Sequence, residues 1–416
     1  MRGRWSDARN SVSFAPNRVH TITHGEDIVP TVKAIDKLAD ILANSENFLQ
    51  KMHELGQAPA QKKEFQRLFS PSEAADMVGR DRTTLARAEK ELGIEPPTRP
   101  GSNRRLGYTL QQIMAFRGHF GTLPWRTETD PAIILGCQSF KGGVGKSTTC
   151  VNLAHYLALK GYRVLVIDTD SQATTTSMFG YVPDVEFTEA DTILPYLAGE
   201  QSTLHYAIRP TYFPNISLIP ACLKLYDAEI AIVTHLMELK PEQRPEFFSE
   251  LRYGIETITK EFDVILLDSP PALGMISLST LLAADALIVP SAARMFDFSS
   301  TVQFFRMIYT YINTILPDKT YRWISVLTTL FDQRYASQRD FVDVMRTCFG
   351  DSVFQRVFFH SSEVINAAAT FRTPYEDTRP PRRVLEMMNS VFQEIEYAIL
   401  REWPSKREEL RSKGII

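Results

Sequence analysis

A glycine-rich stretch of nine residues has the composition needed to bind the phosphates of a nucleotide. Its glycines allow the backbone to curl so that several N–H groups point inward, and the start of a helix adds positive potential there. Lys146 can then reach the outer phosphates, and Ser147 can offer its hydroxyl to Mg²⁺. The predicted nucleotide-binding residues are Lys141, Gly142, Gly143, Val144, Gly145, Lys146, Ser147, Thr148 and Thr149. A glycine-rich turn without a ligand is the alternative, and the flanking strand and helix patterns argue against it.

Three acids stand at the ends of two other apolar runs. Asp168 and Asp170 end the run that begins at Arg163, and Asp268 ends the run that begins at Phe262. A magnesium–nucleotide site needs one or two carboxylates and a hydroxyl around an ion that keeps several waters. We therefore expect Asp268 to serve the metal together with Ser147, and Asp168 to support it indirectly. Asp170 is the predicted acceptor that orients a water for hydrolysis. A helix N-cap is the alternative role for Asp168 and Asp170.

Lys141 lies five residues before Lys146, where an ordinary phosphate loop has no need of a lysine. A side chain at this position would point away from its own loop, unless a nucleotide across an interface used it. The position therefore predicts a dimer in which each Lys141 neutralises the phosphates of the other subunit, like an arginine finger supplied in trans. The predicted catalytic residues are Lys141, Lys146 and Asp170.

These residues need a parallel sheet to bring them together. Apolar runs predict six strands, and the runs alternate with helical patterns such as 151–158, directly after the loop. Such alternation predicts an α/β domain with a parallel sheet covered on both faces, spanning 127–416 and closed by a helix at 382–403. The predicted strands are 133–137, 163–170, 215–220, 262–268, 286–290 and 323–328.

The composition is that of an ordinary globular protein of two or three domains. The chain has 416 residues, of which 44% are hydrophobic and 23% charged, and a net charge of −3. Any nucleic-acid binding must therefore come from local basic patches. The four cysteines are scattered without a CxxC pair, which favours a reducing cytoplasm over a disulfide framework or a zinc site. No run is long enough to span a membrane, and no signal-peptide pattern opens the chain.

The first 60 residues contain one long helical pattern, from about residue 26 to residue 55, followed by a linker at 56–61. Apolar residues recur in it at spacings near three and four. The next stretch offers nothing to cover that apolar face. The helix therefore either docks on the same chain or packs on a second copy as a dimerisation arm, and the second arrangement is our prediction.

Residues 61–126 predict a small DNA-binding domain. Ser70 caps a first helix, with Pro71 and Glu73 completing the start signal, and Gly79 ends it. A second helix begins after Asp81, and the spacing suits a helix-turn-helix. Its predicted buried residues are Leu85, Ala88 and Leu92. Its outer face carries Arg82, Thr83, Thr84, Arg87 and Lys90, of which all but Lys90 are predicted DNA-binding residues.

A basic, turn-rich stretch, 96–108, follows and predicts a wing whose Arg104 and Arg105 contact the DNA backbone. A helix is expected after it, at 111–119, and a linker at 123–130. Between residues 61 and 126 there are 12 Lys and Arg against 7 Asp and Glu. This local excess of positive charge is typical of a DNA-binding module. A helical hairpin with an exposed basic face is the alternative.

Three motifs together resemble the deviant Walker A ATPases of the ParA/MinD group: Lys141–Thr149, Asp168–Gln172 and Ile265–Pro271. The resemblance covers roughly residues 131–400, and the preceding helix-turn-helix makes the chain similar to long, plasmid-type, RepA-like ParA proteins. It implies a P-loop NTPase domain behind an all-α dimerisation helix and a winged helix-turn-helix. It also implies binding of ATP or ADP with Mg²⁺, and slow hydrolysis stimulated by a ParB-type partner. The biological role that the resemblance implies is segregation of a replicon.

The resemblance further implies a cytoplasmic, nucleoid-associated dimer that binds nonspecific DNA and represses its own operon through the helix-turn-helix. Arg334 matches one of the arginines with which short ParA proteins bind nonspecific DNA. Ser171 replaces a proline of the family motif, and 291–298 departs from the pattern expected near the adenosine. A nucleotide-regulated repressor without turnover is the alternative function. The sequence does not show the basic amphipathic tail by which a MinD-like protein reaches the membrane. It also does not show the cysteine pattern of the nitrogenase iron protein.

Overall fold

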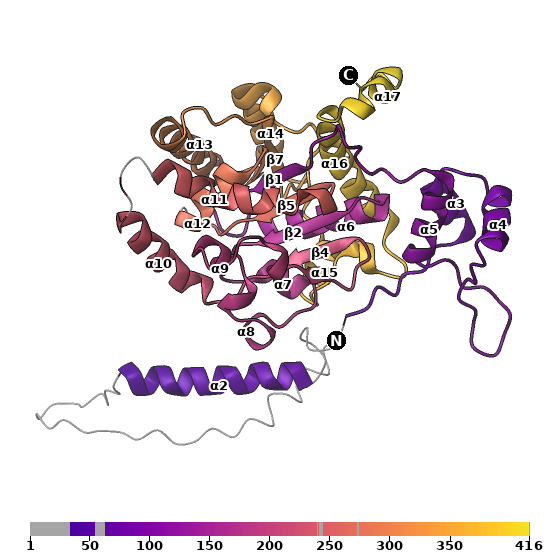
Figure 1. Ribbon diagram of the computed structural model, residues 1–416, viewed down its shortest axis with the longest axis horizontal. Helices are drawn as coiled ribbons and strands as arrows, with labels where there is room; N and C mark the ends of the chain where they lie inside the picture. The colour runs from indigo at the N-terminus through magenta and orange to yellow at the C-terminus, as the bar shows by residue number, and fades with distance from the viewer. Residues whose placement is uncertain (1–33, 55–62, 239, 241–243, 273, 416) are drawn as a thin grey trace, which may run out of the picture. The chain divides into compact units, whose positions relative to one another are not determined.

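The computed structural model describes residues 34–54, 63–238, 240, 244–272 and 274–415 (Figure 1). The chain divides into two compact units, residues 1–58 and residues 59–416. Within the described residues, no helix combines the length and the apolar character needed to cross a membrane.

Helix α2 (Ala34–Glu54) is the described part of the first unit. It confirms the helical pattern predicted for this stretch, whereas the predicted residues 26–33 and the predicted linker at 56–61 lie outside the described residues. The apolar side chains of Ile35, Leu38, Ile41 and Leu42 are more than half exposed. Their spacing places them along one side of the helix, as a surface available to another apolar face.

A seven-stranded sheet forms the centre of the second unit, in the order β3-β4-β2-β5-β1-β6-β7. The strands are β1 (Ile133–Cys137), β2 (Val164–Asp168), β3 (Arg209–Pro210), β4 (Ile216–Ile219), β5 (Val264–Asp268), β6 (Ala286–Ala292) and β7 (Trp323–Thr329). All six predicted strands are confirmed and run parallel to one another. The antiparallel edge strand β3 was missed because it has only two residues, one of them a proline.

Alternate residues of each central strand enter two different hydrophobic cores, as the two faces of a strand require. Ile133 and Leu135 of β1 belong to one core together with residues of the helical segments 146–160 and 382–401, while Ile134 belongs to the other, with residues of the segments 244–256, 275–283 and 295–315. Figure 1 shows the helices of the α/β domain around the sheet. The helices of the α/β domain are α6 (Lys146–Lys160), α7 (Thr174–Met178), α8 (Pro183–Glu186), α9 (Leu194–Leu197), α10 (Leu225–Glu238), α11 (Arg244–Glu256), α12 (Met275–Ala283), α13 (Met295–Ile315), α14 (Ala336–Phe349), α15 (Ser362–Ala368), α16 (Arg382–Arg401) and α17 (Arg407–Ser412).

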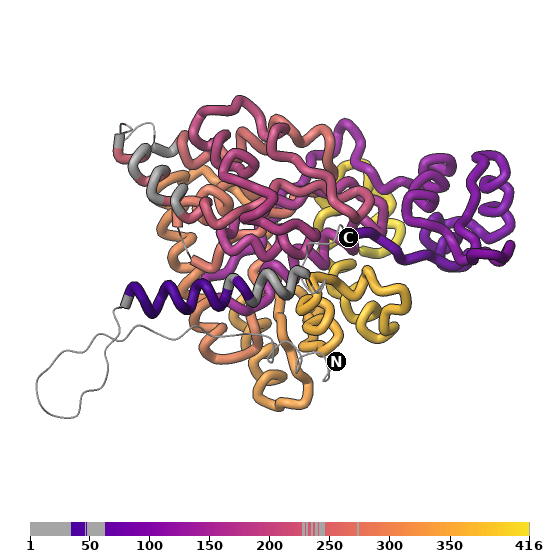
Figure 2. The backbone as a smooth tube through the Cα atoms, turned by 90° about the horizontal axis from the view of Figure 1, so that it is seen from below, coloured from indigo at the N-terminus to yellow at the C-terminus, as the bar shows by residue number. Residues whose placement is uncertain are grey.

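Three helices form a separate module ahead of the sheet: α3 (Pro71–Val78), α4 (Arg82–Glu91) and α5 (Leu110–Phe120). Figure 2 shows them as a compact purple group at one end of the α/β domain. Ser70 and Glu73 form the predicted capping box, Gly79 takes the left-handed conformation (φ 70°), and Asp81 caps α4 through two backbone N–H groups. The local start and stop signals in the sequence are therefore confirmed.

One predicted core residue of this module is exposed. Leu92, expected on the buried side of α4, keeps 40% of its surface exposed. The reason is that α4 ends at Glu91, so Leu92 is already the C-cap and Gly93 (φ 62°) turns the chain away. Ile94, whose N–H donates to the Glu89 carbonyl, packs against the core of the module instead.

The stretch between α4 and α5 folds back on itself as a two-stranded arm. Thr98 pairs with Arg105 as an antiparallel bridge, and the Arg99 N–H donates to the Arg104 carbonyl at 2.9 Å. The guanidinium of Arg105 holds the buried carboxylate of Glu89 with two contacts of 2.8 and 2.9 Å. The arm is thus attached to α4 through an ion pair.

The module is joined to the α/β domain through buried Arg117 of α5. Its guanidinium donates to the carbonyl of Met77 at the end of α3 and to the carbonyl of Lys160 at the end of α6. Gly161 follows α6 with φ 106°, and a Cβ there would meet the Arg117 guanidinium and Pro124. The Trp125 indole donates to the Gly161 carbonyl at 3.0 Å. The predicted linker at 123–130 is therefore an ordered, bonded segment.

A second junction lies before α3, where Lys63 is inserted among distant parts of the chain. Its ammonium group donates to the carbonyls of Met178 and Phe371, and it lies 3.0 Å from a carboxylate oxygen of Glu376. It also lies 4.2 Å from the ring centroid of Tyr212. Burial lowers the pKa of Lys63 to about 8, against the opposing effect of Glu376.

Candidate nucleotide site

The loop between β1 and α6 has the geometry of a phosphate cradle. Gly143 and Gly145 both have positive φ angles, 74° and 91°, which glycine adopts without strain. A Cβ added at Gly142, Gly143 or Gly145 would meet no heavy atom within 4 Å, so open space lies beside the loop. Helix α6 begins at Lys146 without any side-chain cap, which leaves its first N–H groups for a ligand.

Lys146 lies inside this cradle and is 7% exposed. Its ammonium group donates to the Lys141 carbonyl at 3.3 Å. Burial lowers the pKa of Lys146, and the nearby charges of Asp268 and Asp170 act in the opposite direction. The loop is fixed from the far side by Thr329 at the end of β7, whose hydroxyl donates to the Val144 carbonyl at 2.7 Å. The structure therefore brings Lys146 together with two of the three predicted acids.

Lys141 has a partner within its own chain. Its ammonium group lies 2.8 Å from Oδ1 of Asp297, near the start of α13. Asp297 is 3% exposed, and its Oδ2 atom has no hydrogen-bond partner among the described residues. Lys141 itself is 40% exposed. In this state the lysine compensates a buried carboxylate, and any reach toward a second subunit would require that ion pair to open.

Asp268 ends β5 at the point where β1 and β2 end beside it, because Cys137 and Asp168 are its register partners. Its Oδ2 atom accepts a hydrogen bond of 2.7 Å from the Thr175 hydroxyl. Its Oδ1 atom is buried and has no hydrogen-bond partner among the described residues. Burial raises the pKa of Asp268 to about 6, and the nearby hydroxyls of Thr175 and Ser147 act against this rise. A buried, unpaired carboxylate oxygen beside a serine hydroxyl fits the donor set of Mg²⁺.

Asp168 and Asp170 lie next to each other but have different environments. Asp168 is completely buried, and its Oδ2 atom accepts both the N–H and the hydroxyl of Thr176. Burial raises the pKa of Asp168, and the charge of Asp268 adds to the rise. Asp170 is 8% exposed and accepts the Gln172 N–H at 3.0 Å. Asp168 is thus held within the protein, while Asp170 remains close to the surface of the site.

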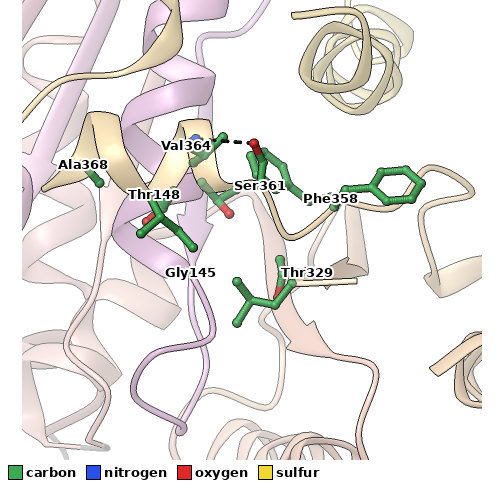
Figure 3. Close-up of a pocket in the computed structure, with 11 residues that line it drawn as sticks. Gly145, Thr148, Thr329, Phe358, Ser361, Val364 and Ala368 are labelled. Carbon is green, nitrogen blue, oxygen red and sulfur yellow. Dashed lines mark hydrogen bonds between the residues drawn. The ribbon is translucent and has the colours of Figure 1, made fainter. Parts of the chain in front are cut away.

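A cavity of about 170 Å³ adjoins the cradle (Figure 3). Its walls come from the start of α6, the end of β7, the segment 358–361 and α15. In Figure 3, Thr148 of α6 and Val364 of α15 lie close together, with Thr329 of β7 across from them, and Ser361 caps α15 through the Val364 N–H. The lining is mostly apolar, and Leu330, with φ 52°, turns the chain into it. Such a hollow beside a phosphate loop has the character of a site for a flat, weakly polar ring.

The predicted DNA-binding residues of the module lie on its outer surface. Arg82, Thr83 and Arg87 are exposed, as is Arg104. Thr84 is half-buried because its hydroxyl donates to the capping carboxylate of Asp81 at 2.6 Å. Arg105 is also exposed, and its guanidinium forms an ion pair with Glu89.

Arg334, the remaining predicted DNA contact, is separate from this group and 79% exposed. Its guanidinium forms a fork on Asp332, with contacts of 2.6 and 2.9 Å, and this lowers the pKa of Asp332 to about 2.

Sequence reasoning missed several residues of this region. Thr175 and Thr176 appeared only as part of a polar loop, although the run of three threonines directly after the acids was a usable signal. Asp297 carried no local signal, because its role depends on a lysine 156 positions earlier. The cavity residues after β7 were also missed, since they come from segments far apart in the chain.

Comparisons with known proteins show the family to which the chain belongs. A family model described as an AAA domain matches residues 132–318. Protein SopA of Escherichia coli is 35% identical over 309 residues, which cover 73% of this chain and 79% of SopA. A putative replication protein A of Rhizobium rhizogenes is 30% identical over 392 residues, covering 90% of this chain and 97% of the relative. The chain belongs to the ParA/SopA family of plasmid partition ATPases. The resemblance of the motifs to long, RepA-like ParA proteins is thereby confirmed.

Solved structures show the same fold for this ParA/SopA-type ATPase. A structure described as a partition protein aligns with a TM-score of 0.61 at 18% identity, over 88% of this chain and 99% of that protein. A plasmid partition protein of Borrelia burgdorferi, bound to AMPPNP, aligns with a TM-score of 0.50 at 24% identity, over 64% of this chain and 98% of that protein. The prediction of a P-loop α/β domain behind an N-terminal helical region is confirmed.

Proposed function

We propose that this partition ATPase dimerises with ATP, binds nonspecific DNA in that state and positions a replicon in response to a ParB-type partner. In the ADP state it binds an operator through residues 61–126 and represses its own operon. The observation that carries the nucleotide part is the unpaired Oδ1 atom of Asp268 beside the uncapped start of α6. An unpaired acceptor and a row of free donors are what a magnesium–phosphate group requires.

Within this proposal, the phosphates lie against the N–H groups of 142–149, and Lys146 neutralises them. Ser147 and Asp268 would hold Mg²⁺, and Asp168 would support the ion indirectly. Bound Mg²⁺ would neutralise charge on the phosphate oxygens and fix their position. Among the described residues there is no cluster of three or more metal-ligating side chains, so waters and phosphate oxygens complete the coordination. Asp170 accepts a hydrogen bond from the attacking water.

The nucleoside belongs in the cavity formed by the end of β7, the segment 358–361 and α15. The departure of 291–298 from the family pattern does not affect this assignment, because none of those residues lines the cavity. Apolar walls with a few hydroxyl groups suit an adenine ring that needs orientation more than charge. The AMPPNP bound to the Borrelia burgdorferi relative supports a nucleotide of this class.

Dimerisation uses two parts of the chain. Lys141 leaves Asp297 and neutralises the phosphates held by the second subunit, which makes each site incomplete on its own. Helix α2 supplies a further contact, because Ile35, Leu38 and Leu42 form an exposed apolar row that suits the same row of a second copy.

DNA binding also has two parts. Helices α3 and α4 form a helix-turn-helix, and the arm at 96–108 is its wing. Arg82, Thr83, Thr84 and Arg87 read the operator, while Arg104 and Arg105 contact phosphates. Arg334 contributes to the nonspecific surface of the ATP dimer.

DNA binding measured by fluorescence anisotropy over a range of salt concentrations tests the proposal. A random duplex and the chain's own operator region are compared with ATP, with ADP and without nucleotide. With ATP we expect a steep salt dependence and equal affinity for both duplexes, because phosphate contacts dominate. With ADP we expect preference for the operator region. Equal binding in all three nucleotide states would overturn the proposal.

A repressor that uses nucleotide only as a conformational ligand is the second candidate. The ion pair between Lys141 and Asp297 favours it, since that contact withholds the lysine from a partner. A steady-state ATPase assay with DNA and the ParB-type partner separates the two functions: turnover supports segregation, and repression without turnover supports the second candidate.

A further inference from the structure

Two threonine hydroxyls of α7 hold the two buried acids of the site. The Thr175 hydroxyl donates to Asp268 at 2.7 Å, and the Thr176 hydroxyl donates to Asp168 at the same distance. Both threonines are completely buried. A buried hydroxyl with one charged acceptor is held firmly in place, so each threonine fixes the rotation of one carboxylate.

The two carboxylates are fixed in different ways. Asp168 uses its oxygens inside the protein, because Oδ2 accepts twice from Thr176 and Oδ1 accepts the Asp170 N–H. Asp268 uses only Oδ2, and its Oδ1 atom has no partner among the described residues. The bond from Thr175 therefore determines which of the two Asp268 oxygens remains available. Among the described residues, no other hydrogen bond distinguishes Oδ1 from Oδ2 of this carboxylate.

The chain reaches Thr175 through a strained turn. Ala173, the residue before α7, has φ 49°, a left-handed conformation that is uncommon for alanine. The Ala173 N–H donates to the Asp170 carbonyl at 2.8 Å, and the Gln172 N–H donates to the Asp170 side chain. Strain of this kind persists only where surrounding contacts impose it, and it is common at functional sites. The turn fixes Asp170 and Thr175 relative to each other.

We propose that Thr175 is a positioning residue for the metal: it orients Asp268 so that Oδ1 faces the ion held with Ser147. The inference rests on the magnesium–nucleotide site proposed above and names a residue of that site. Thr175 does not contact the ion in this arrangement; it acts through Asp268. Groups that orient metal ligands typically change metal affinity by about 10- to 100-fold when removed.

Thr175 is a cleaner test than Thr176. The Thr176 hydroxyl also accepts the N–H of Ala221 at 3.0 Å, so its removal would break two structural contacts. Thr175→Val keeps the shape of the side chain and removes one hydrogen bond. Thr175→Ser restores the hydroxyl, and Thr174→Val is a matched control because Thr174 is exposed in the same helix.

The experiment measures binding of a fluorescent ATP analogue to the full chain in EDTA and over a Mg²⁺ titration, with thermal unfolding as a fold check. We expect Thr175→Val to bind the analogue in EDTA within about twofold of the unmodified chain, and to need about tenfold more Mg²⁺ for half-maximal effect. Thr175→Ser should return the Mg²⁺ requirement to within about twofold, and Thr174→Val should not change it.

Two results would overturn the inference. One is an unchanged Mg²⁺ requirement in Thr175→Val; the other is an equal loss of binding in EDTA and in Mg²⁺ that Thr175→Ser does not restore, which would indicate a structural role. If the valine variant does not fold, Thr175→Ala is measured against the same criteria. If the unmodified chain itself shows no Mg²⁺-dependent binding, the proposed function fails first, and the two failures remain distinguishable.

Discussion

The nucleotide site and the junction between the helical module and the α/β domain both bury charged groups, but they satisfy them differently. At the site, Asp268 and Asp297 each keep one oxygen without a partner among the described residues. At the junction, Arg117 spans two carbonyls, and Lys63 has two carbonyls, a tyrosine and a carboxylate. Burying an unsatisfied polar atom is costly, so it persists where a ligand completes it. The contrast separates two acids that keep an acceptor oxygen for a ligand from two cations whose partners all lie within the chain.

The largest effect that this contrast predicts is at Lys146. Lys146→Ala should weaken nucleotide binding by about 100-fold or more, because a charge-assisted contact to phosphate is lost in a mostly buried site. Binding of a fluorescent ATP analogue measures this. Lys160→Ala, at the exposed far end of the same helix, is the control and should bind normally. Retained binding in Lys146→Ala would refute the assignment of the site.

Substitution of Lys141 should affect ATP-dependent dimerisation much more than ATP binding. Lys141→Ala should bind ATP within about threefold of the unmodified chain but lose the ATP-dependent dimer, since its charge is needed by the partner's phosphates. Light scattering coupled to size exclusion, with ATP and Mg²⁺, measures the dimer.

Removing Lys141 also leaves the buried Asp297 carboxylate without its ion-pair partner. The variant Lys141→Ala/Asp297→Asn therefore serves as a control for this cost. An ATP dimer of normal stability in both variants would contradict the role across the interface.

At the junction, Lys63→Met should reduce the free energy of unfolding by about 2 kcal/mol at pH 7, because Glu376 loses a buried partner. The lowered pKa of Lys63, about 8, means that the unfolded state binds more protons between about pH 8 and 10.5. The unmodified chain should therefore gain stability relative to Lys63→Met as the pH rises from 8 to about 10.5, on the order of 3 kcal/mol in all.

Urea unfolding at several pH values measures the difference, with Lys90→Met, at an exposed lysine, as control. A difference that shrinks with rising pH would show that the ion pair with Glu376 outweighs the burial of Lys63.

The smallest effect should distinguish the two arginines of the arm. Arg104→Ala should reduce the salt slope of DNA binding by about one phosphate contact and leave stability unchanged. Arg105→Ala should reduce the slope similarly and also cost about 1 kcal/mol, because Glu89 keeps a buried charge without its guanidinium. Anisotropy and thermal unfolding of both variants measure this. Equal stability of the two variants would mean that the ion pair between Arg105 and Glu89 contributes nothing to the free energy of unfolding.

Local signals carried most of what could be predicted. The loop, its helix and the strand-end acids were predictable because each depends on a few neighbouring residues, and the register of three parallel strands then brings them together. The capping signals of α3 and α4 were equally local. The prediction that Leu92 is buried was wrong because α4 ends at Glu91, one residue before it, so Leu92 is the C-cap and is exposed.

Contacts between distant segments could not be predicted. Lys63 meets Glu376 across 313 positions, and Arg117 meets α6 across 43. The orientation of Asp268 depends on a hydroxyl delivered by a strained alanine turn. Composition and periodicity do not contain this information, because it arises only when the chain has folded. The function of such residues therefore follows from the geometry alone.

Helix α6 has its first turn at the phosphate loop and its last carbonyls under Arg117. Fifteen residues make it a stiff lever about 22 Å long. A tilt of about 5° at the nucleotide end would displace the other end by about 2 Å, by the same helical dimensions. Gly161 leaves no slack there, since even a methyl group would meet the Arg117 guanidinium. One continuous helix thus connects the phosphate loop to the Arg117 junction. We therefore expect a change in the bound phosphates to move the last turn of α6.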